Sequence, residues 1–218
     1  MPSGKVITEK TTSDNIYDRL LDYVFSDQVQ PGEKLVERDL AEKFQVSRVP
    51  IREALAKMVA QGLLVGGGHR QGVRVRHYTP AEIQQLIEFR SFMESSAIEI
   101  AAQKAEAADL EFLESICEEA EYVDIANDWE TWGNLDHQFH AGIARASHNA
   151  RLAASLEGLL TEYHFIFYIH PRNRWTNLAE KTSEMKQRVL DTHRQILAAI
   201  TAGNAPLAVQ ILHHHLSR

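Results

Sequence analysis

The chain has 218 residues, of which 44% are hydrophobic and 24% are charged, and these are the proportions of a soluble globular protein with one large domain or two ordinary ones. A membrane span is not expected, because no apolar run reaches about 18 residues, and the polar start of the chain lacks the apolar core of a signal peptide. A single cysteine, Cys117, excludes an internal disulfide framework. We therefore expect a cytoplasmic protein that makes no membrane contact.

The net charge of −7 is unevenly distributed along the chain. Residues 1–78 contain 12 Lys and Arg against 10 Asp and Glu, a net charge of +2, whereas residues 79–218 contain the remaining 11 and 20, a net charge of −9. Between Arg48 and Arg76 there are six basic residues and one acidic residue, Glu53. A basic patch on an acidic chain predicts that one part of the protein binds a polyanion.

Residues 1–77 alternate short helical patterns with turn signals. The stretch SDNIYDRLLDYVFSDQ repeats apolar residues at helical spacing, and QPGEKL after it reads as a turn. Residues 36–44 form a short helical pattern, and the next helix begins with Ser47 as its N-cap and Pro50 in its first turn. The segments LLV and VRV then predict two short strands around the glycine-rich GGGHRQG. This order of elements is that of a winged helix-turn-helix domain.

In such a domain the second helix of the pair enters the major groove of DNA by its N-terminal end. Arg48 and Arg52 lie four residues apart at this end, where a guanidinium can bind a guanine or a phosphate, and Ser47 suits a phosphate. The predicted wing tip has polar side chains that would reach the neighbouring minor groove or backbone: His69, Arg70 and Gln71. The alternative is that Arg48 and Arg52 form a solvated face that pairs with Glu53 or other nearby acids.

The stretch LVERDLAEKFQVSRVPIREALAKMVAQGLL, followed by RQGVRV, closely resembles the DNA-binding domain of GntR-type bacterial transcription regulators. The resemblance covers about residues 14–76, and the pattern SR-P-REAL…L…GL is specific for that family. It implies that residues of the helix pair and the wing face DNA: Arg38, Ser47, Arg48, Arg52 and Gly72. We include Pro50, in the first turn of the same helix, among the predicted DNA-binding residues. The usual leucine after AL is Met58 here, which is a volume-conserving exchange.

Residues 78–218 have a helical texture after a short linker at 76–79. Thr79 is a predicted N-cap, with Pro80 at the first helical position and Glu82 close behind it. Further helical patterns occupy residues 108–125, 129–147, 152–169, 178–201 and 205–216. No β-rich segment follows the linker, so we predict a mainly α protein whose C-terminal domain is an all-helical bundle.

Two pairs of polar residues lie on apolar helix faces in this bundle. Asp136 and His140 are four residues apart, so they share a face with core residues. His193 and His215 lie on either side of a helical hairpin at 203–206, each roughly 15 Å from the bend. The four side chains can therefore converge, and three nitrogens with one oxygen suit a divalent transition metal such as Zn²⁺ or Ni²⁺. The alternative is that each histidine is an ordinary hydrogen-bonded core or surface residue.

Three segments, FRSFMESSAIEIAA, LDHQFHAGIARASHNARL and THRQILAAITAGNAPLAVQILHHHL, resemble the helical effector domain of the FadR subgroup of GntR regulators, the FCD type. The resemblance covers about residues 79–216. It implies a metal site made by one aspartate and three histidines: Asp136, His140, His193 and His215. Only the spacing and the family pattern select His215 over its neighbours His213 and His214.

Arg90 lies on the apolar face of its helix, with Glu94 one turn later. We consider both as effector-binding residues, since a guanidinium fork can hold the carboxylate of an organic acid that completes the metal coordination. The alternative is a simple ion pair between residues four apart. Weaker effector-binding candidates are Arg145 and Asn149, and Arg172 and Arg174 are more simply explained as loop charges.

These features predict a metabolite-responsive transcription regulator rather than an enzyme. We expect a repressor that binds a pseudo-palindromic double-stranded operator as a homodimer and is released by a small organic acid bound near the metal. Two alternatives remain: a metal-dependent enzyme of the hydrolase or oxygenase kind, and a regulator whose signal is the metal itself.

Overall fold

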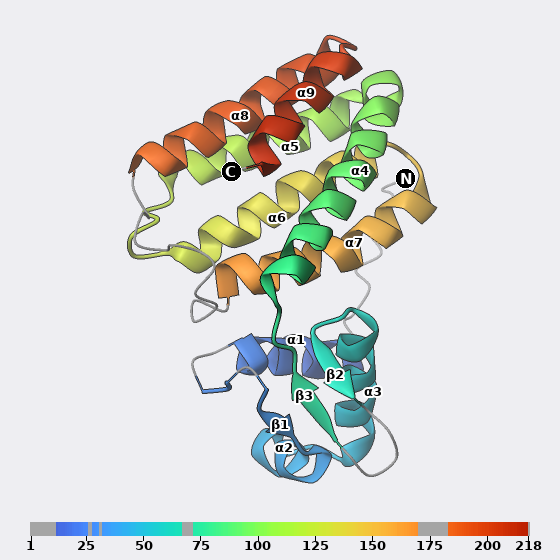
Figure 1. Cartoon of the computed structure of the whole chain (residues 1–218), viewed down its shortest axis with the longest axis vertical. Coiled ribbons are helices and arrows are strands. Elements are labelled where there is room, and N and C mark those ends of the chain that lie inside the picture. The colour runs from blue at the N-terminus through green and yellow to red at the C-terminus, as the bar shows by residue number, and fades with distance from the viewer. Residues whose placement is uncertain (1–11, 26–27, 31, 67–71, 170–182, 218) are drawn as a thin grey trace, which may run out of the picture. The chain divides into compact units, whose positions relative to one another are not determined.

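The computed structural model describes residues 12–25, 28–30, 32–66, 72–169 and 183–217 (Figure 1). The chain divides into two compact units, Met1–His77 and Tyr78–Arg218. Within the described ranges, no helix combines the length and the apolar character that a membrane crossing requires.

The described part of the first unit contains three helices and a small sheet. The helices are α1 (Thr12–Phe25), α2 (Glu37–Phe44) and α3 (Arg48–Ala60), and the strands are β1 (Lys34–Leu35), β2 (Leu64–Gly66) and β3 (Val73–Val75). The strands form an antiparallel sheet in the order β1-β3-β2. The predicted winged helix-turn-helix fold is thereby confirmed, with β2 and β3 as the wing.

The sequence prediction missed β1, because QPGEKL was assigned to a turn alone. Gly32 does adopt a turn conformation with φ of +81°, but Lys34 and Leu35 then pair with Arg74 and Val73. A strand of two residues is too short to show alternation of apolar and polar residues. Its partner lies almost forty residues further along the chain, so only the folded sheet defines it.

Helix α1 packs against the buried side of α3. Its apolar residues Ile16 and Leu20 are buried, and α1 packs against α3, whose Ile51 and Met58 are also buried. Helix α2 contributes buried Leu40 to the same core. Because the core holds one side of α3, its opposite side, which includes Arg48 and Arg52, is left exposed.

The second unit is an all-helical bundle, as predicted. Its helices are α4 (Pro80–Lys104), α5 (Ala107–Tyr122), α6 (Trp129–Ala146), α7 (Ala150–His164), α8 (Ser183–Thr201) and α9 (Ala205–Leu216). The pattern at 152–169 was predicted as one α-helix, but the structure ends α7 at His164 and continues with a π-helical turn, η1 (Phe165–Ile169). The start predicted for α8 at residue 178 falls outside the described residues.

Helix α6 lies inside this bundle, against α4, α5 and α7 (Figure 1). Because neighbours cover most of its surface, polar residues such as Asp136 and His140 are buried along with its apolar ones. Helices α8 and α9 form the predicted hairpin. Gly203 has φ of +68°, a left-handed conformation that favours glycine, and Asn204 then caps α9 through a hydrogen bond from Leu207 N.

Helix α4 begins with a complete capping box. Thr79 Oγ1 accepts a hydrogen bond from Glu82 N, and the Glu82 carboxylate accepts one from Thr79 N.

We predict that Thr79→Ala lowers the free energy of unfolding by about 1 kcal/mol, the usual cost of losing a threonine N-cap. Denaturant titration followed by circular dichroism measures this, with Thr79→Ser as the matched control. Equal stability of the alanine and serine variants would contradict the prediction.

Candidate metal centre and nucleic-acid interface

The exposed N-terminal end of α3 carries the predicted DNA-binding residues. Arg48 is the first residue of the helix and Pro50 lies in its first turn. Ser47 occupies the N-cap position with extended backbone angles, but its side chain makes no capping hydrogen bond. Its hydroxyl is exposed and is not used by the helix.

Arg48 and Arg52 share one carboxylate, that of Glu37 at the start of α2. Arg48 Nη2 donates to Glu37 Oε2 at 3.2 Å, and Arg52 donates through Nε to Oε1 and through Nη2 to Oε2, both at 3.1 Å. These bonds, that of Arg52 first, lower the pKa of Glu37 and keep it ionised. The alternative considered from the sequence, that the two arginines pair with a nearby acid, therefore applies, and the acid is Glu37. Each arginine side chain nevertheless remains 61% exposed.

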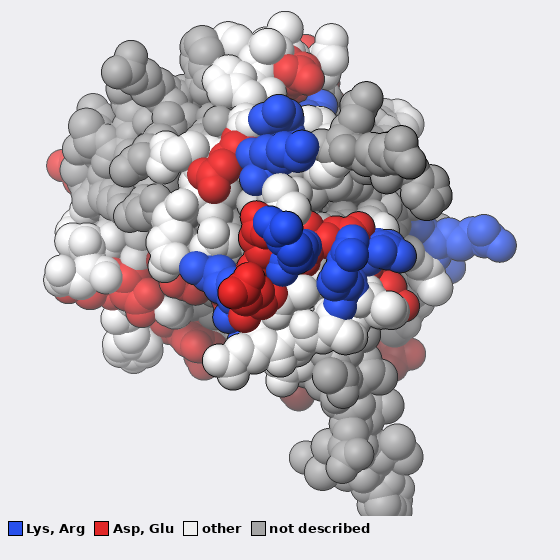
Figure 2. Space-filling view, turned by 90° about the horizontal axis from the view of Figure 1, so that it is seen from below, with Lys and Arg blue, Asp and Glu red and all other residues white. Residues whose placement is uncertain are grey.

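Two further residues predicted to face DNA, Arg38 and Gly72, lie within the described residues of the first unit. Arg38 is exposed and pairs with Asp39 at 3.0 Å. Gly72 has φ of +68°, and a Cβ at this position would lie 2.8 Å from Lys34 Cε, so the backbone passes closely under β1. Figure 2 shows basic and acidic side chains side by side on the face seen from below. His69, Arg70 and Gln71 lie outside the described residues.

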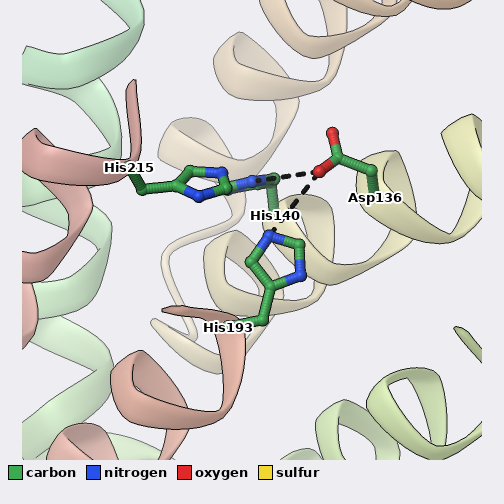
Figure 3. Close-up of side chains that lie close together, drawn as sticks. All are labelled: Asp136, His140, His193 and His215. Carbon is green, nitrogen blue, oxygen red and sulfur yellow. Dashed lines mark ion pairs between the residues drawn. The ribbon is translucent and has the colours of Figure 1, made fainter. Parts of the chain in front are cut away.

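The second unit brings four predicted metal ligands together. Asp136 and His140 project from α6, His193 from α8 and His215 from α9 (Figure 3). One ligand atom of each lies within 4.8 Å of those of the other three. Asp136 Oδ1 is 3.6 Å from His193 Nε2 and 3.9 Å from His140 Nε2, distances too long for hydrogen bonds.

Two of the nitrogens in this cluster are shielded from solvent. His140 Nε2 and His193 Nε2 are buried and have no hydrogen-bond partner within the part of the chain that the structure describes. Unsatisfied buried polar atoms are costly and uncommon in folded proteins. Both nitrogens lie near one carboxylate oxygen and a third imidazole, which is the donor set of a transition-metal site. The four residues therefore fit a divalent cation.

The imidazole of His193 is held as a neutral ligand would be. Its ring stacks on Phe139, with centroids 4.1 Å apart and planes at 11°. Burial, followed by the nearby His215 and His140, lowers the pKa of His193 well below its ordinary value. A neutral imidazole has a lone pair available for a metal, whereas an imidazolium does not.

Glu94 and Arg90 of α4 form a second layer behind His140. Glu94 Oε2 lies 2.5 Å from His140 Nδ1, and Glu94 Oε1 accepts a hydrogen bond from Arg90 Nε. Burial alone would raise the pKa of Glu94, but the charge of Arg90 and the hydrogen bonds that Glu94 accepts from Arg90 and His140 outweigh it and lower the pKa to about 2. An ionised Glu94 favours a proton on His140 Nδ1, which leaves Nε2 as the atom that can bind a metal.

Arg90 remains a candidate for effector binding, because its donors are not all used. Its guanidinium lies 3.9 Å from the centre of the Tyr163 ring, and its Nη2 is buried without a hydrogen-bond partner among the described residues. Glu94 is different, because Arg90 and His140 occupy both of its oxygens. Its contacts favour a positioning role over direct contact with an effector.

The structure does not bring the two weaker candidates to the cluster. Arg145 is exposed and lies over the Phe112 ring, with its guanidinium carbon 5.1 Å from the ring centre. Asn149 is the N-cap of α7 and accepts a hydrogen bond from Leu152 N. These contacts explain both residues without an effector. Arg172 and Arg174 lie outside the described residues.

Three residues around the two sites were missed or incompletely assigned from the sequence: Glu37, Tyr163 and Glu94. Each meets a residue of another helix, so no spacing along the chain links the partners. A weak signal did exist for Glu94, since a carboxylate on an otherwise apolar helix face must find a buried partner.

Comparison with known proteins identifies both units. Residues 12–75 match the family model described as bacterial regulatory proteins, gntR family, and residues 85–218 match the model of the FCD domain. The chain is 30% identical to the "Putative L-lactate dehydrogenase operon regulatory protein" of Escherichia coli (strain K12), over 97% of this chain and 86% of the relative. It is also 30% identical to the HTH-type transcriptional regulator LutR of Bacillus subtilis (strain 168), over 87% and 91%.

Solved structures agree with this result. E. coli McbR/YncC has the same fold, with a TM-score of 0.75 at 19% identity over 95% of this chain and 94% of that one. A GntR family transcriptional regulator from Pseudomonas syringae pv. tomato has a TM-score of 0.54 at 27% identity over 94% and 81%. The two curated relatives and the P. syringae protein are named as regulators. The chain therefore belongs to the GntR family of bacterial regulatory proteins, with a C-terminal FCD domain.

Proposed function

We propose that this regulator is a cytoplasmic, metabolite-responsive repressor of the FadR subgroup, released from its operator by a small organic acid that binds near a metal in the helical bundle. The observation that carries the proposal is the pair of buried nitrogens of His140 and His193 beside Asp136, which have no hydrogen-bond partner among the residues that the structure describes. The similarity to an E. coli protein named for the L-lactate dehydrogenase operon supports an organic acid as the class of effector.

In this proposal Asp136, His140, His193 and His215 hold Zn²⁺ or Ni²⁺. The metal would supply Lewis-acidic positions for water or for the carboxylate of the effector. Arg90 would bind the same carboxylate through Nη2, which has no other hydrogen-bond partner in the described part of the chain. An effector shifts the arrangement of the DNA-binding units only if it binds one arrangement more tightly than another.

The DNA-binding half of the proposal concerns Arg48, Arg52 and Ser47 at the exposed end of α3. A homodimer would present two such helix ends to the two halves of a pseudo-palindromic operator. Arginine contacts to phosphates displace bound counterions, so affinity for DNA should fall steeply with salt.

We predict that replacing Arg48 and Arg52 together by alanine strongly weakens operator binding. Each lost contact to a base costs about 1–3 kcal/mol, which corresponds to a combined loss of at least about 30-fold. The operator is first selected from a random duplex pool by the wild-type protein, and affinity is then measured by fluorescence anisotropy. Lys104→Ala, at the end of α4 in the other unit, is the control. Unchanged affinity in the double variant would refute this interface.

We predict that wild-type protein stripped with chelator rebinds about one Zn²⁺ or Ni²⁺ per chain and gains thermal stability on doing so. His193→Ala should weaken this binding by more than about 100-fold, and Glu94→Gln by about 10–100-fold, as expected of a residue that orients a ligand. Equilibrium dialysis with elemental analysis measures both. His214→Ala is the control, because it changes an exposed neighbour of His215.

Stoichiometric binding that survives His193→Ala would exclude this site. The chelator-stripped wild-type protein also shows whether the signal is the metal or an organic acid. Operator affinity is measured first as metal alone is added and then as small organic acids are added at a fixed metal concentration. Release by metal without any acid would replace the organic-acid proposal by one in which the metal is the signal.

The proposed homodimer has a candidate surface on α4. Phe89 and Phe92 lie three residues apart on this helix and are 54% and 68% exposed, and adjacent exposed aromatic residues are typical of an interface. We predict that the double replacement Phe89→Ser and Phe92→Ser converts a dimer to a monomer in sedimentation equilibrium. Tyr122→Ser, which changes an exposed aromatic residue of α5, should leave the dimer intact. A monomeric wild-type protein would refute the dimer, and a dimeric double variant would exclude this surface.

A further inference from the structure

We propose that Glu37 is a specificity-determining residue of the DNA interface, because its carboxylate positions both arginines of α3 for reading base edges. This inference rests on the proposed DNA-binding function and adds a residue to it. Glu37 comes from a different helix, α2, and is the acidic partner that the structure places against Arg48 and Arg52.

The hydrogen bonds restrict both side chains but leave donors available. Arg52 is held side-on through Nε and Nη2, which fixes the plane of its guanidinium. Arg48 is held through Nη2 alone. Among the described residues no hydrogen bond uses Nη1 of either arginine. A guanidinium has five N–H donors, so each can still present a pair of them to guanine O6 and N7.

Without Glu37 the two arginines would behave differently. Both side chains are mostly exposed, and like charges four residues apart on a helix repel each other. Long exposed side chains also lose conformational freedom when they are fixed against DNA. A carboxylate that accepts hydrogen bonds from both removes the repulsion and orders the side chains before DNA arrives. Ordering of this kind favours base contacts, which depend on direction, more than phosphate contacts, which depend mainly on charge.

The negative charge of Glu37 also has a cost near DNA. A carboxylate repels phosphates and cancels one of the two arginine charges, so it weakens binding to any sequence. If Glu37 only formed a solvated ion pair, it would reduce operator and non-operator binding by the same factor. If it positions the arginines, it reduces non-operator binding and supports operator binding. The ratio of the two affinities therefore distinguishes the two roles.

The test compares wild-type protein with Glu37→Gln as full-length chains. One DNA probe is the duplex that the wild-type protein selects from a random pool, and the other is a scrambled duplex of the same length and composition. Fluorescence anisotropy at several salt concentrations gives both affinities. Glu42→Gln is the matched control, because Glu42 is an exposed acid on the same helix α2 and its replacement removes the same charge.

For Glu37→Gln we expect tighter binding to the scrambled duplex, with a salt dependence steeper by about one counterion. The ratio of operator to scrambled affinity should fall by about tenfold, within the range set by one bidentate arginine–guanine contact. Glu42→Gln should leave the ratio unchanged. An unchanged melting temperature by circular dichroism shows that the variant is folded.

Two results would overturn the inference while leaving the DNA-binding function in place. Equal changes in both affinities, including no change, would make Glu37 a solvated partner only. A larger gain for the operator than for the scrambled duplex would make it a competitor of DNA for the arginines. By contrast, failure of the wild-type protein to select any sequence would refute the proposed function itself.

Discussion

The interior of the helical bundle contains ionisable side chains that water cannot reach, and their need for partners organises the second unit. His140 is satisfied at Nδ1 by Glu94, and Glu94 is in turn satisfied by Arg90. Within the described ranges, His140 Nε2 and His193 Nε2 have no hydrogen-bond partner, and both lie near Asp136. Each of these groups would be costly to bury alone. A divalent cation bound among them would satisfy both nitrogens and the carboxylate at once, which is why the geometry favours a metal centre over a structural core.

An arginine–carboxylate pair suits different roles depending on whether it is buried or exposed, and this chain contains an example of each. Arg90 and Glu94 are almost fully buried, so removing either partner would leave an uncompensated charge in the core. That pair is suited to hold His140 in one orientation. Arg48 and its partner Glu37 lie at the surface, where water competes and the bonds contribute little to stability. Such bonds can be rearranged, which suits a site that must present donors to DNA.

Local pattern was enough for much of the fold. The helix starts at Thr79 and Asn204 depend on residues within one turn of the cap, so residue type alone indicates them. The convergence of His193 with His215 could be anticipated as well, since helix rise and one hairpin relate their heights. Strand β1 could not be anticipated, because it requires a distant partner, and no feature of the sequence pattern marked the π-helical turn η1.

The sequence by itself determined the two-part organisation, the winged helix-turn-helix, the helical bundle and the four residues that could bind a metal, because all of these are recorded in spacing along single elements or in recognisable motifs. Only the tertiary structure determined which acidic side chain pairs with which basic side chain. Glu37 meets Arg52 across two helices, and Glu94 meets His140 across two others. Contacts of this kind depend on helix packing angles and on burial, which set distances between side chains that no periodicity along the chain encodes.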